Sequence, residues 1–361
     1  MVITENAVFS VARYYMAYVN PFIIFSGVVG NVLTLVVLPT IRNKVHSATV
    51  TYLLCLAVSD LLVLFSSSIP EWYGIHLPAV IDHDSDSSST FPRLNILTIS
   101  DAACKNLFYI YDASSTISAW ILVIFAVERC IAIWFPLNVS TLVTKRRRYV
   151  AVFFVICLAC LTRFPSFLYA AVHSPVGINV TICSIKPSNL APGMFQLYSI
   201  LQYMLHTTIP WAAICTNSAL VLARIRSPYG HLRSASAVNI KRDRKCLLNL
   251  MAVNGAFIIL LGPQTIIGTL YTCSRSQSSD LSFIPAGFTS HLTHLFELSV
   301  LAKNIAAVNH SINNVIYTYN IKQYREGLKR IFCCRRNDDS SARYLNRRSA
   351  ISARRSSETD L

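Results

Sequence analysis

The sequence has few charged residues. Asp, Glu, Lys and Arg make up 14% of its 361 residues, whereas an average soluble protein contains about 25%. So little charge cannot cover the surface of a soluble globular protein, which argues against an ordinary soluble enzyme. Metal-hydrolase, nucleophile and phosphate-loop motifs are also missing from the sequence, so we expect that the protein is not an enzyme.

Long apolar runs take the place of charge. Hydrophobic residues reach 53%, which argues against a disordered chain. A helix needs roughly 20 apolar residues to cross a bilayer. Seven runs approach this length: 18–38, 49–71, 106–133, 149–171, 196–223, 245–273 and 294–319. The sequence therefore predicts an all-α membrane protein, a seven-transmembrane helix bundle over residues 18–319. The third and seventh runs contain several ionisable residues and are expected to be the least apolar.

The basic residues gather at one end of these runs. They lie after run one, at and after the end of run three, between runs five and six including the first residue of run six, and in the segment after run seven. Together these groups hold 25 of the 32 Lys and Arg residues. The positive-inside rule makes that end cytoplasmic and leaves residues 1–17 outside the cell. We expect a multi-pass protein of the plasma membrane whose positive charge faces anionic lipid rather than nucleic acid.

The segment after the last run carries further signals. Residues 320–334 are amphipathic and predict a short eighth helix, followed by a disordered cytoplasmic tail over 335–361. Cys333 and Cys334 suit palmitoylation, with an unmodified pair as the alternative. The C-terminal sequence from Thr359 to Leu361 fits a PDZ ligand, and the Ser-rich tail could recruit arrestin once phosphorylated. Both tail motifs also arise by chance.

The predicted topology sorts the remaining modification sites. Cys104, Cys183 and Cys273 lie on the oxidising side of the membrane. Asn179, in the second outer loop, starts an N-x-S/T sequon and is expected to be glycosylated.

An acidic residue lies in the middle of the second run. Asp60 needs polar partners there, and Asn31, Ser118, Asn309 and Asn313 lie at matching depths in other runs. Such a set of oxygen atoms suits Na⁺ or a proton. A water-filled hydrogen-bond network is an equally weighted alternative.

Ionisable residues also lie at both ends of the bundle. At the inner end, Glu128 or Asp243 could hold Arg129 in one state and release it in another; an ordinary charge cluster is the alternative. At the outer end, charged and aromatic residues suit a cavity for a large amphipathic ligand such as a peptide. For each of these outer residues, pairing with a neighbour is the alternative. The outer set is Glu71, Tyr109, Tyr111, Asp112, Arg163, Gln264, Glu297 and Lys303.

Taken in order, the motifs resemble those of a rhodopsin-like (class A) G protein-coupled receptor. The resemblance covers roughly residues 18–334. Its motifs are Gly30-Asn31, Leu56-Ala57-x-x-Asp60, Cys104, Glu128-Arg129-Cys130, Pro136-Leu137, Pro165, Cys183, Pro210, Phe257, Pro263 and Asn313-Asn314-x-x-Tyr317.

The resemblance implies roles for several of these residues. It implies a disulfide between Cys104 and Cys183, a switch at Glu128, Arg129, Asp243, Asn313 and Tyr317, and an allosteric Na⁺ site at Asp60, Ser118, Asn309 and Asn313. It further implies an outer ligand cavity and an inner face that binds a heterotrimeric G protein. The Glu128–Leu137 stretch and the mixed charges of the cavity resemble invertebrate FMRFamide-like neuropeptide receptors. The alternatives are a non-peptide ligand, a receptor-like protein that does not signal, and a transporter.

The sequence departs from the family pattern at several positions. Leu261 stands where helix six usually carries Trp, and Asn314 replaces the usual proline of helix seven. His310 replaces a small residue, and Ser218 replaces a Tyr. We therefore expect helix seven to bend less than usual.

Overall fold

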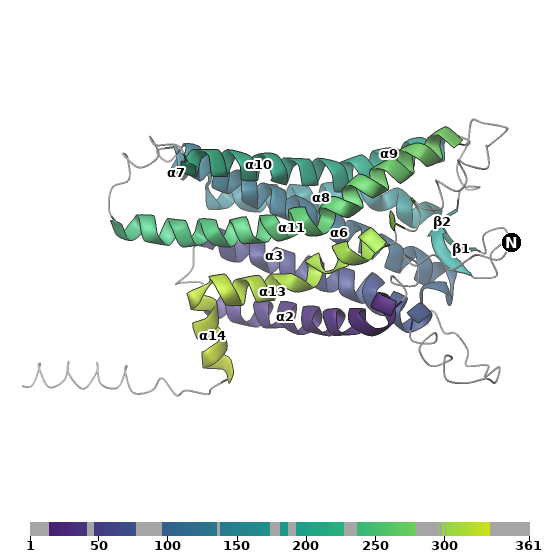
Figure 1. Ribbon diagram of the computed structural model, residues 1–361, viewed down its shortest axis with the longest axis horizontal. Helices are drawn as coiled ribbons and strands as arrows, with labels where there is room; N and C mark the ends of the chain where they lie inside the picture. Colours follow the sequence, from purple (N-terminus) through teal and green to yellow (C-terminus); the bar gives the residue numbers. More distant parts are fainter. Residues whose placement is uncertain are drawn as a thin grey trace, which may run out of the picture.

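The computed structural model describes residues 14–41, 47–76, 96–135, 138–173, 181–186, 193–226, 237–278, 295, 298–299 and 301–332. Its long helices run side by side in a single bundle (Figure 1). Among the described residues, five helices are long and apolar enough to cross a membrane. The third of these, Asp101–Trp134, is as apolar as the second, so the expected weakness of the third run was wrong.

The first half of the chain supplies three of the bundle's helical segments. The first consists of the π-helical η1 (Tyr15–Val19) and α2 (Asn20–Thr40). The second combines α3 (Ser47–Val63), η2 (Leu64–Ser68), α4 (Ile69–Glu71) and η3 (Trp72–His76). A 3-10 turn, η5 (Ile96–Thr98), precedes α6 (Asp101–Trp134). The Ser100 hydroxyl accepts a hydrogen bond from the Ala103 amide and caps α6.

The second half completes the bundle. The short α7 (Val139–Leu142) leads to α8 (Lys145–Tyr169), and the hairpin of β1 (Ala170–His173) and β2 (Ile182–Ile185) follows. Next come α9 (Met194–Tyr203), η7 (Met204–Thr208), α10 (Ile209–Arg226) and α11 (Ala237–Ser278). The last segment is helical over 301–307 and continues as α13 (Asn309–Asn320) and α14 (Lys322–Phe332).

A disulfide marks one end of the bundle. Cys104, in the first turn of α6, is bonded to Cys183 of β2, which confirms the expected pair. Strands β1 and β2 are antiparallel, and Val172 pairs with Cys183. We call this the disulfide end; α14 lies at the opposite end (Figure 1).

Proline explains the widened π-helical turns. Each of the four π-helical segments in the described part of the chain ends two residues before a proline: Pro21, Pro70, Pro78 or Pro210. A proline ring lacks an N–H and clashes with the carbonyl four residues earlier, so the preceding turn opens. Ala17, four residues before Pro21, shows the result, because its carbonyl accepts a hydrogen bond from Trp72 Nε1 at 3.2 Å.

Helix α6 lies at the centre of the bundle and packs against α3, α8 and α10. The fully buried rings of Tyr52 and Phe125 meet there, with centroids 5.2 Å apart. Large apolar side chains are exposed on the outside of the bundle, such as Phe22 on α2 and Phe153 on α8. A bundle that is apolar on the outside as well as inside is what a lipid environment requires.

The last membrane helix is interrupted before Asn314, the position at which the family's usual proline would bend it. Val308 forms a turn, and α13 then runs through Asn314 without a break. The Asn314 side-chain oxygen accepts a hydrogen bond from the Tyr324 hydroxyl at 2.6 Å. The same hydroxyl lies 3.0 Å from Thr34 Oγ1 of α2. The Tyr324 hydroxyl therefore links α14 to α2 and, through Asn314, to α13; a proline at position 314 could not accept this hydrogen bond.

Helix α14 lies within the predicted segment 320–334 and turns away from the bundle axis (Figure 1). Gly327 lets it approach α2 closely, because a Cβ at this position would lie 2.7 Å from Val37 Cγ1. Arg325 caps the preceding helix by donating hydrogen bonds to the carbonyls of Thr318 and Tyr319.

Candidate functional site

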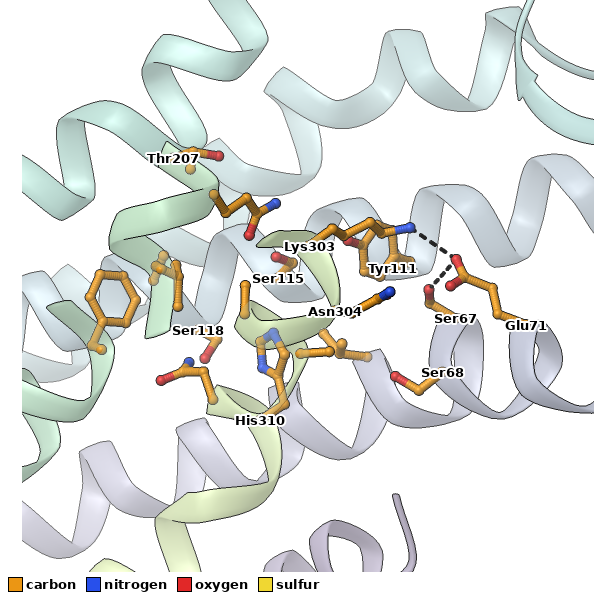
Figure 2. Close-up of a pocket in the computed structure, with 18 of the residues that line it drawn as sticks. Ser67, Ser68, Glu71, Tyr111, Ser115, Ser118, Thr207, Lys303, Asn304 and His310 are labelled. Atoms are coloured by element: carbon orange, nitrogen blue, oxygen red, sulfur yellow. Dashed lines mark hydrogen bonds and ion pairs between the residues drawn. The ribbon is translucent and has the colours of Figure 1, made fainter. Parts of the chain in front are cut away.

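A small cavity of about 70 Å³, lined by both polar and apolar residues, lies inside the bundle. Its lining comes from η1, α2, the second membrane segment, α6, η7, α11 and the helix around residue 303 (Figure 2). Four of the expected ligand residues line it: Glu71, Tyr111, Gln264 and Lys303. Three of the π-helical segments also contribute, through Met16, Ser67 and His206. The proline-induced turns thus shape the cavity wall.

An ion pair crosses this cavity. Lys303 Nζ lies 3.0 Å from Glu71 Oε1, and the Ser67 hydroxyl donates a second hydrogen bond to the same oxygen at 3.0 Å (Figure 2). The ammonium group also lies 5.7 Å from the centre of the Tyr111 ring, within cation–π range. The Lys303 side chain is 46% exposed and that of Glu71 25%, so an incoming ligand can reach both.

His206 was missed by the sequence analysis. It belongs to η7, lines the cavity and is only 7% exposed. Neither ring nitrogen has a hydrogen-bond partner within the part of the chain that the structure describes. Pro210, four residues later, is the signal that could have pointed to it, because the widened turn contains this residue. A buried imidazole without a partner is available to a ligand.

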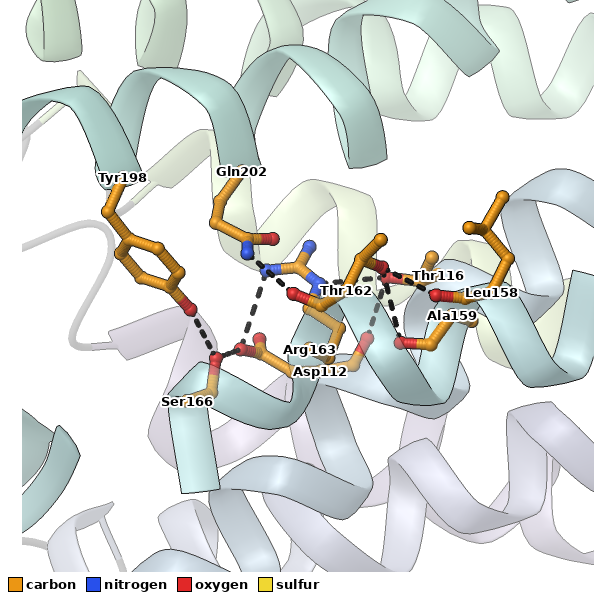
Figure 3. Close-up of polar contacts among 9 residues, drawn as sticks. All are labelled: Asp112, Thr116, Leu158, Ala159, Thr162, Arg163, Ser166, Tyr198 and Gln202. Carbon is orange, nitrogen blue, oxygen red and sulfur yellow. Dashed lines mark hydrogen bonds and ion pairs between the residues drawn. The ribbon is translucent and has the colours of Figure 1, made fainter. Parts of the chain in front are cut away.

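Three of the expected ligand residues lie elsewhere. Asp112 and Arg163 form an ion pair of 3.4 Å between α6 and α8, and Arg163 Nε donates to Thr116 Oγ1 at 3.0 Å (Figure 3). The Ser166 hydroxyl donates to Asp112 at 2.7 Å and lies 2.8 Å from the Tyr198 hydroxyl of α9. This cluster joins three helices and is not part of the cavity lining.

Tyr109 also belongs to an interface between helices. Its hydroxyl donates to the Cys160 carbonyl at 3.1 Å, and its ring packs edge-on against Phe167. The side chain therefore contacts α8 rather than the cavity. Tyr109, Asp112 and Arg163 thus differ from the sequence expectation, because their rotational positions on α6 and α8 place them at a helix contact.

Asp60 is fully buried and lies behind two residues of the cavity lining, Ser118 and His310. Ser118 Oγ donates to its Oδ1 at 2.9 Å, and Asn313 Nδ2 donates to its Oδ2 at 2.7 Å. A third contact was not expected: His310 Nδ1 lies 2.7 Å from Oδ1. Asn309 lines the cavity, whereas the described side chains that hydrogen-bond to Asp60 are those of Ser118, His310 and Asn313.

The residues around Asp60 do not fit a sodium ion. Na⁺ is a hard cation that needs several oxygen ligands. Two of the three groups against the carboxylate, from His310 and Asn313, instead present nitrogen atoms. Because an ionised carboxylate only accepts hydrogen bonds, each of these nitrogens directs an N–H hydrogen at it. These hydrogens already satisfy the carboxylate and would repel a cation.

Glu128 and Arg129 are adjacent in the sequence, but their side chains have different partners in the structure. Glu128 forms a buried ion pair of 2.9 Å with Arg148, the fourth residue of α8. Arg129 instead lies over the Phe125 ring at 5.5 Å, and its buried Nε has no partner within the described ranges. Successive residues on a helix point about 100° apart, which separates the two side chains. The expectation that Glu128 holds Arg129 therefore does not match this arrangement.

Other expected residues can be placed only in part. Asn313 and Tyr317 are buried on α13, and the Tyr317 ring packs edge-on against Tyr324. Asp243 belongs to α11, but its side chain is outside the described part. Outside the described residues altogether are Glu297, Asn179, Cys333, Cys334, Thr359 and Leu361.

Comparison with known proteins identifies the family. A family model described as "7 transmembrane receptor (rhodopsin family)" matches residues 30–299. The chain belongs to this family. It is a multi-pass G protein-coupled receptor of the plasma membrane and not an enzyme, which confirms the rhodopsin-like resemblance and the predicted fold class.

Two relatives give a closer view of the receptor. It is 23% identical to human "Galanin receptor type 1" over 315 residues, which are 87% of this chain and 80% of the relative. It is 21% identical to "Proteinase-activated receptor 1" of Xenopus laevis over 298 residues, covering 82% of this chain and 61% of the relative. The finer resemblance to FMRFamide-like receptors stays a prediction.

Proposed function

We propose that this receptor is activated by an extracellular peptide and signals through a heterotrimeric G protein. The observation that carries the proposal is the cavity, where opposite charges, a Tyr ring and an unpartnered imidazole face one space. Receptors of the galanin and proteinase-activated classes among its relatives support a peptide rather than a small apolar ligand.

The cavity volume limits how a peptide would bind. Sites for drug-sized ligands measure about 300–1,000 Å³, whereas this cavity measures about 70 Å³. The space suits one terminus or one polar side chain of a peptide. A charged group of the peptide that entered the cavity would compete with Glu71 or Lys303 for the partner of its ion pair. Binding would therefore separate helices that this pair now joins.

The orientation follows from charge and disulfide chemistry. We place the disulfide end outside the cell, because disulfides form in oxidising compartments and basic residues that the structure describes, such as Arg148, Arg224 and Lys322, belong to helix ends away from it. The G protein would then bind near Arg129 and the basic residues that flank α10 and α11. Arrestin binding at the phosphorylated tail, a PDZ partner and lipid anchoring at Cys333 and Cys334 belong to the same proposal.

The test is G protein dissociation in cells, measured for each Gα class against a library of amidated neuropeptides that includes FMRFamide-like sequences. We expect a peptide response that Arg129→Ala abolishes. Glu71→Lys and Lys303→Glu should each weaken it, and the double variant should restore part of it because the pair is re-formed with reversed charges. Ser26→Ala, on the exposed face of α2, is the control. Silence toward every peptide, with surface expression verified, would contradict the proposal and favour a non-peptide ligand.

A further inference from the structure

We infer that the His310 imidazole is a permanent internal partner of Asp60 that occupies the place of a cation, so that Na⁺ does not regulate this receptor through Asp60. The inference depends on the receptor fold but not on the identity of the ligand. It rests on three observations: the contacts of Asp60, the support of His310, and the position of the ring in the cavity lining.

The contacts of Asp60 use three of the roughly four acceptor positions of its carboxylate. Its carboxylate accepts three hydrogen bonds of 2.7–2.9 Å, and both oxygens are used. A carboxylate only accepts, so the facing ring nitrogen of His310 carries a hydrogen. The carboxylate is fully buried and the imidazole 13% exposed. An ion could enter only if the ring left and its hydrogen bond were lost in a dry environment, where such bonds are strongest.

The backbone holds His310 in this position. His310 lies in the first turn of α13, directly after the turn at Val308. Its carbonyl accepts a hydrogen bond from Asn31 Nδ2 of α2 at 2.9 Å. The backbone of His310 is thus fixed from its own helix and from a neighbouring one, so the ring can leave Asp60 only by a change of side-chain rotamer that breaks its contact with the carboxylate.

The ring also separates Asp60 from the ligand cavity. His310 and Ser118 line the cavity, toward its far end from Glu71 (Figure 2). A cation that enters from the disulfide end therefore meets the imidazole before it reaches the carboxylate. An ion that replaced the ring would have oxygen atoms from Asp60, Ser118 and the neighbouring amides, so the set becomes suitable only without the imidazole.

The test measures the melting temperature of the purified full-length receptor in NaCl and in KCl at equal ionic strength. We expect equal melting temperatures for the wild type. In His310→Ser and His310→Ala the melting temperature should rise with NaCl in a saturable way, because Na⁺ binds the folded state. The double variant Asp60→Asn/His310→Ser should lose this rise. His173→Ser, which replaces a histidine of β1, is the matched control and should behave like the wild type.

Each outcome decides the inference. A Na⁺-specific rise in the wild type would overturn it, and this measurement needs no variant to fold. Equal melting temperatures in NaCl and KCl for both His310 variants would also overturn it, since the ring would then not be what excludes the ion. A rise in the variants that persists after Asp60→Asn would place the ion elsewhere and equally refute the proposed site.

Discussion

Loss of Arg148 should destabilise the receptor strongly, because it would leave a carboxylate buried and unpaired. The side chains of Arg148 and Glu128 are 5% and 7% exposed. Three N–O contacts join them, at 2.9, 3.3 and 3.4 Å, and the guanidinium also faces the Tyr52 ring at 6.0 Å. Removing one partner of such a pair typically costs about 3–5 kcal/mol. Arg148→Met keeps most of the side-chain volume and isolates the charge effect.

The double replacement gives the opposite result. In Glu128→Leu/Arg148→Met no charge remains to be desolvated, so the stability should return to within about 1 kcal/mol of the wild type. The two single variants and the double variant form a double-mutant cycle, measured as melting temperatures of the solubilised receptor. Arg147→Met is the control, because the neighbouring Arg147 is exposed and bonds only to carbonyls at the end of α7.

The signalling consequence can be measured with the same variants. Without Arg148, an unpaired carboxylate lies on the turn of α6 that carries Arg129, so basal G protein activity should change in Arg148→Met and be unaffected in Arg147→Met. The reasoning would be refuted if Arg148→Met cost less than about 1 kcal/mol, or if the double variant were no more stable than the less stable single one.

Three further changes test the fold around the site. Asn314→Pro should destabilise the receptor by about 3 kcal/mol, since the ring interrupts α13 and removes the hydrogen bond to Tyr324; an unchanged melting temperature would contradict this. Gly327→Val should displace α14 from Val37, seen as faster hydrogen exchange of α14 amides, because even a Cβ comes within 2.7 Å. Cys104→Ser opens a link across 79 positions of the sequence and should cost at most about 4.5 kcal/mol in chain entropy, measured as surface expression and melting temperature; equal values in a reduced wild type and the variant would be the required control.

The sequence by itself determined the architecture. Transfer of apolar residues into lipid depends on local composition, so hydropathy located the membrane helices, and the ordered motifs indicated the family and the Cys104–Cys183 pair. The sequence also predicted that Asp60, Ser118 and Asn313 lie close together, because the depth of each residue in the membrane follows from its position along its helix.

The tertiary structure alone decided which charges meet. The depth of a residue in the membrane depends only on its position along its own helix. Which side chain it contacts depends on how neighbouring helices are rotated about their axes, and this rotation is set by packing across the bundle. Glu128 therefore bonds to Arg148 rather than to its sequence neighbour, and Asp112 turns to Arg163 at a helix contact instead of the cavity. His310 reaches Asp60 for the same reason. A rotation of 100° per residue separates adjacent side chains, while packing joins residues 250 positions apart.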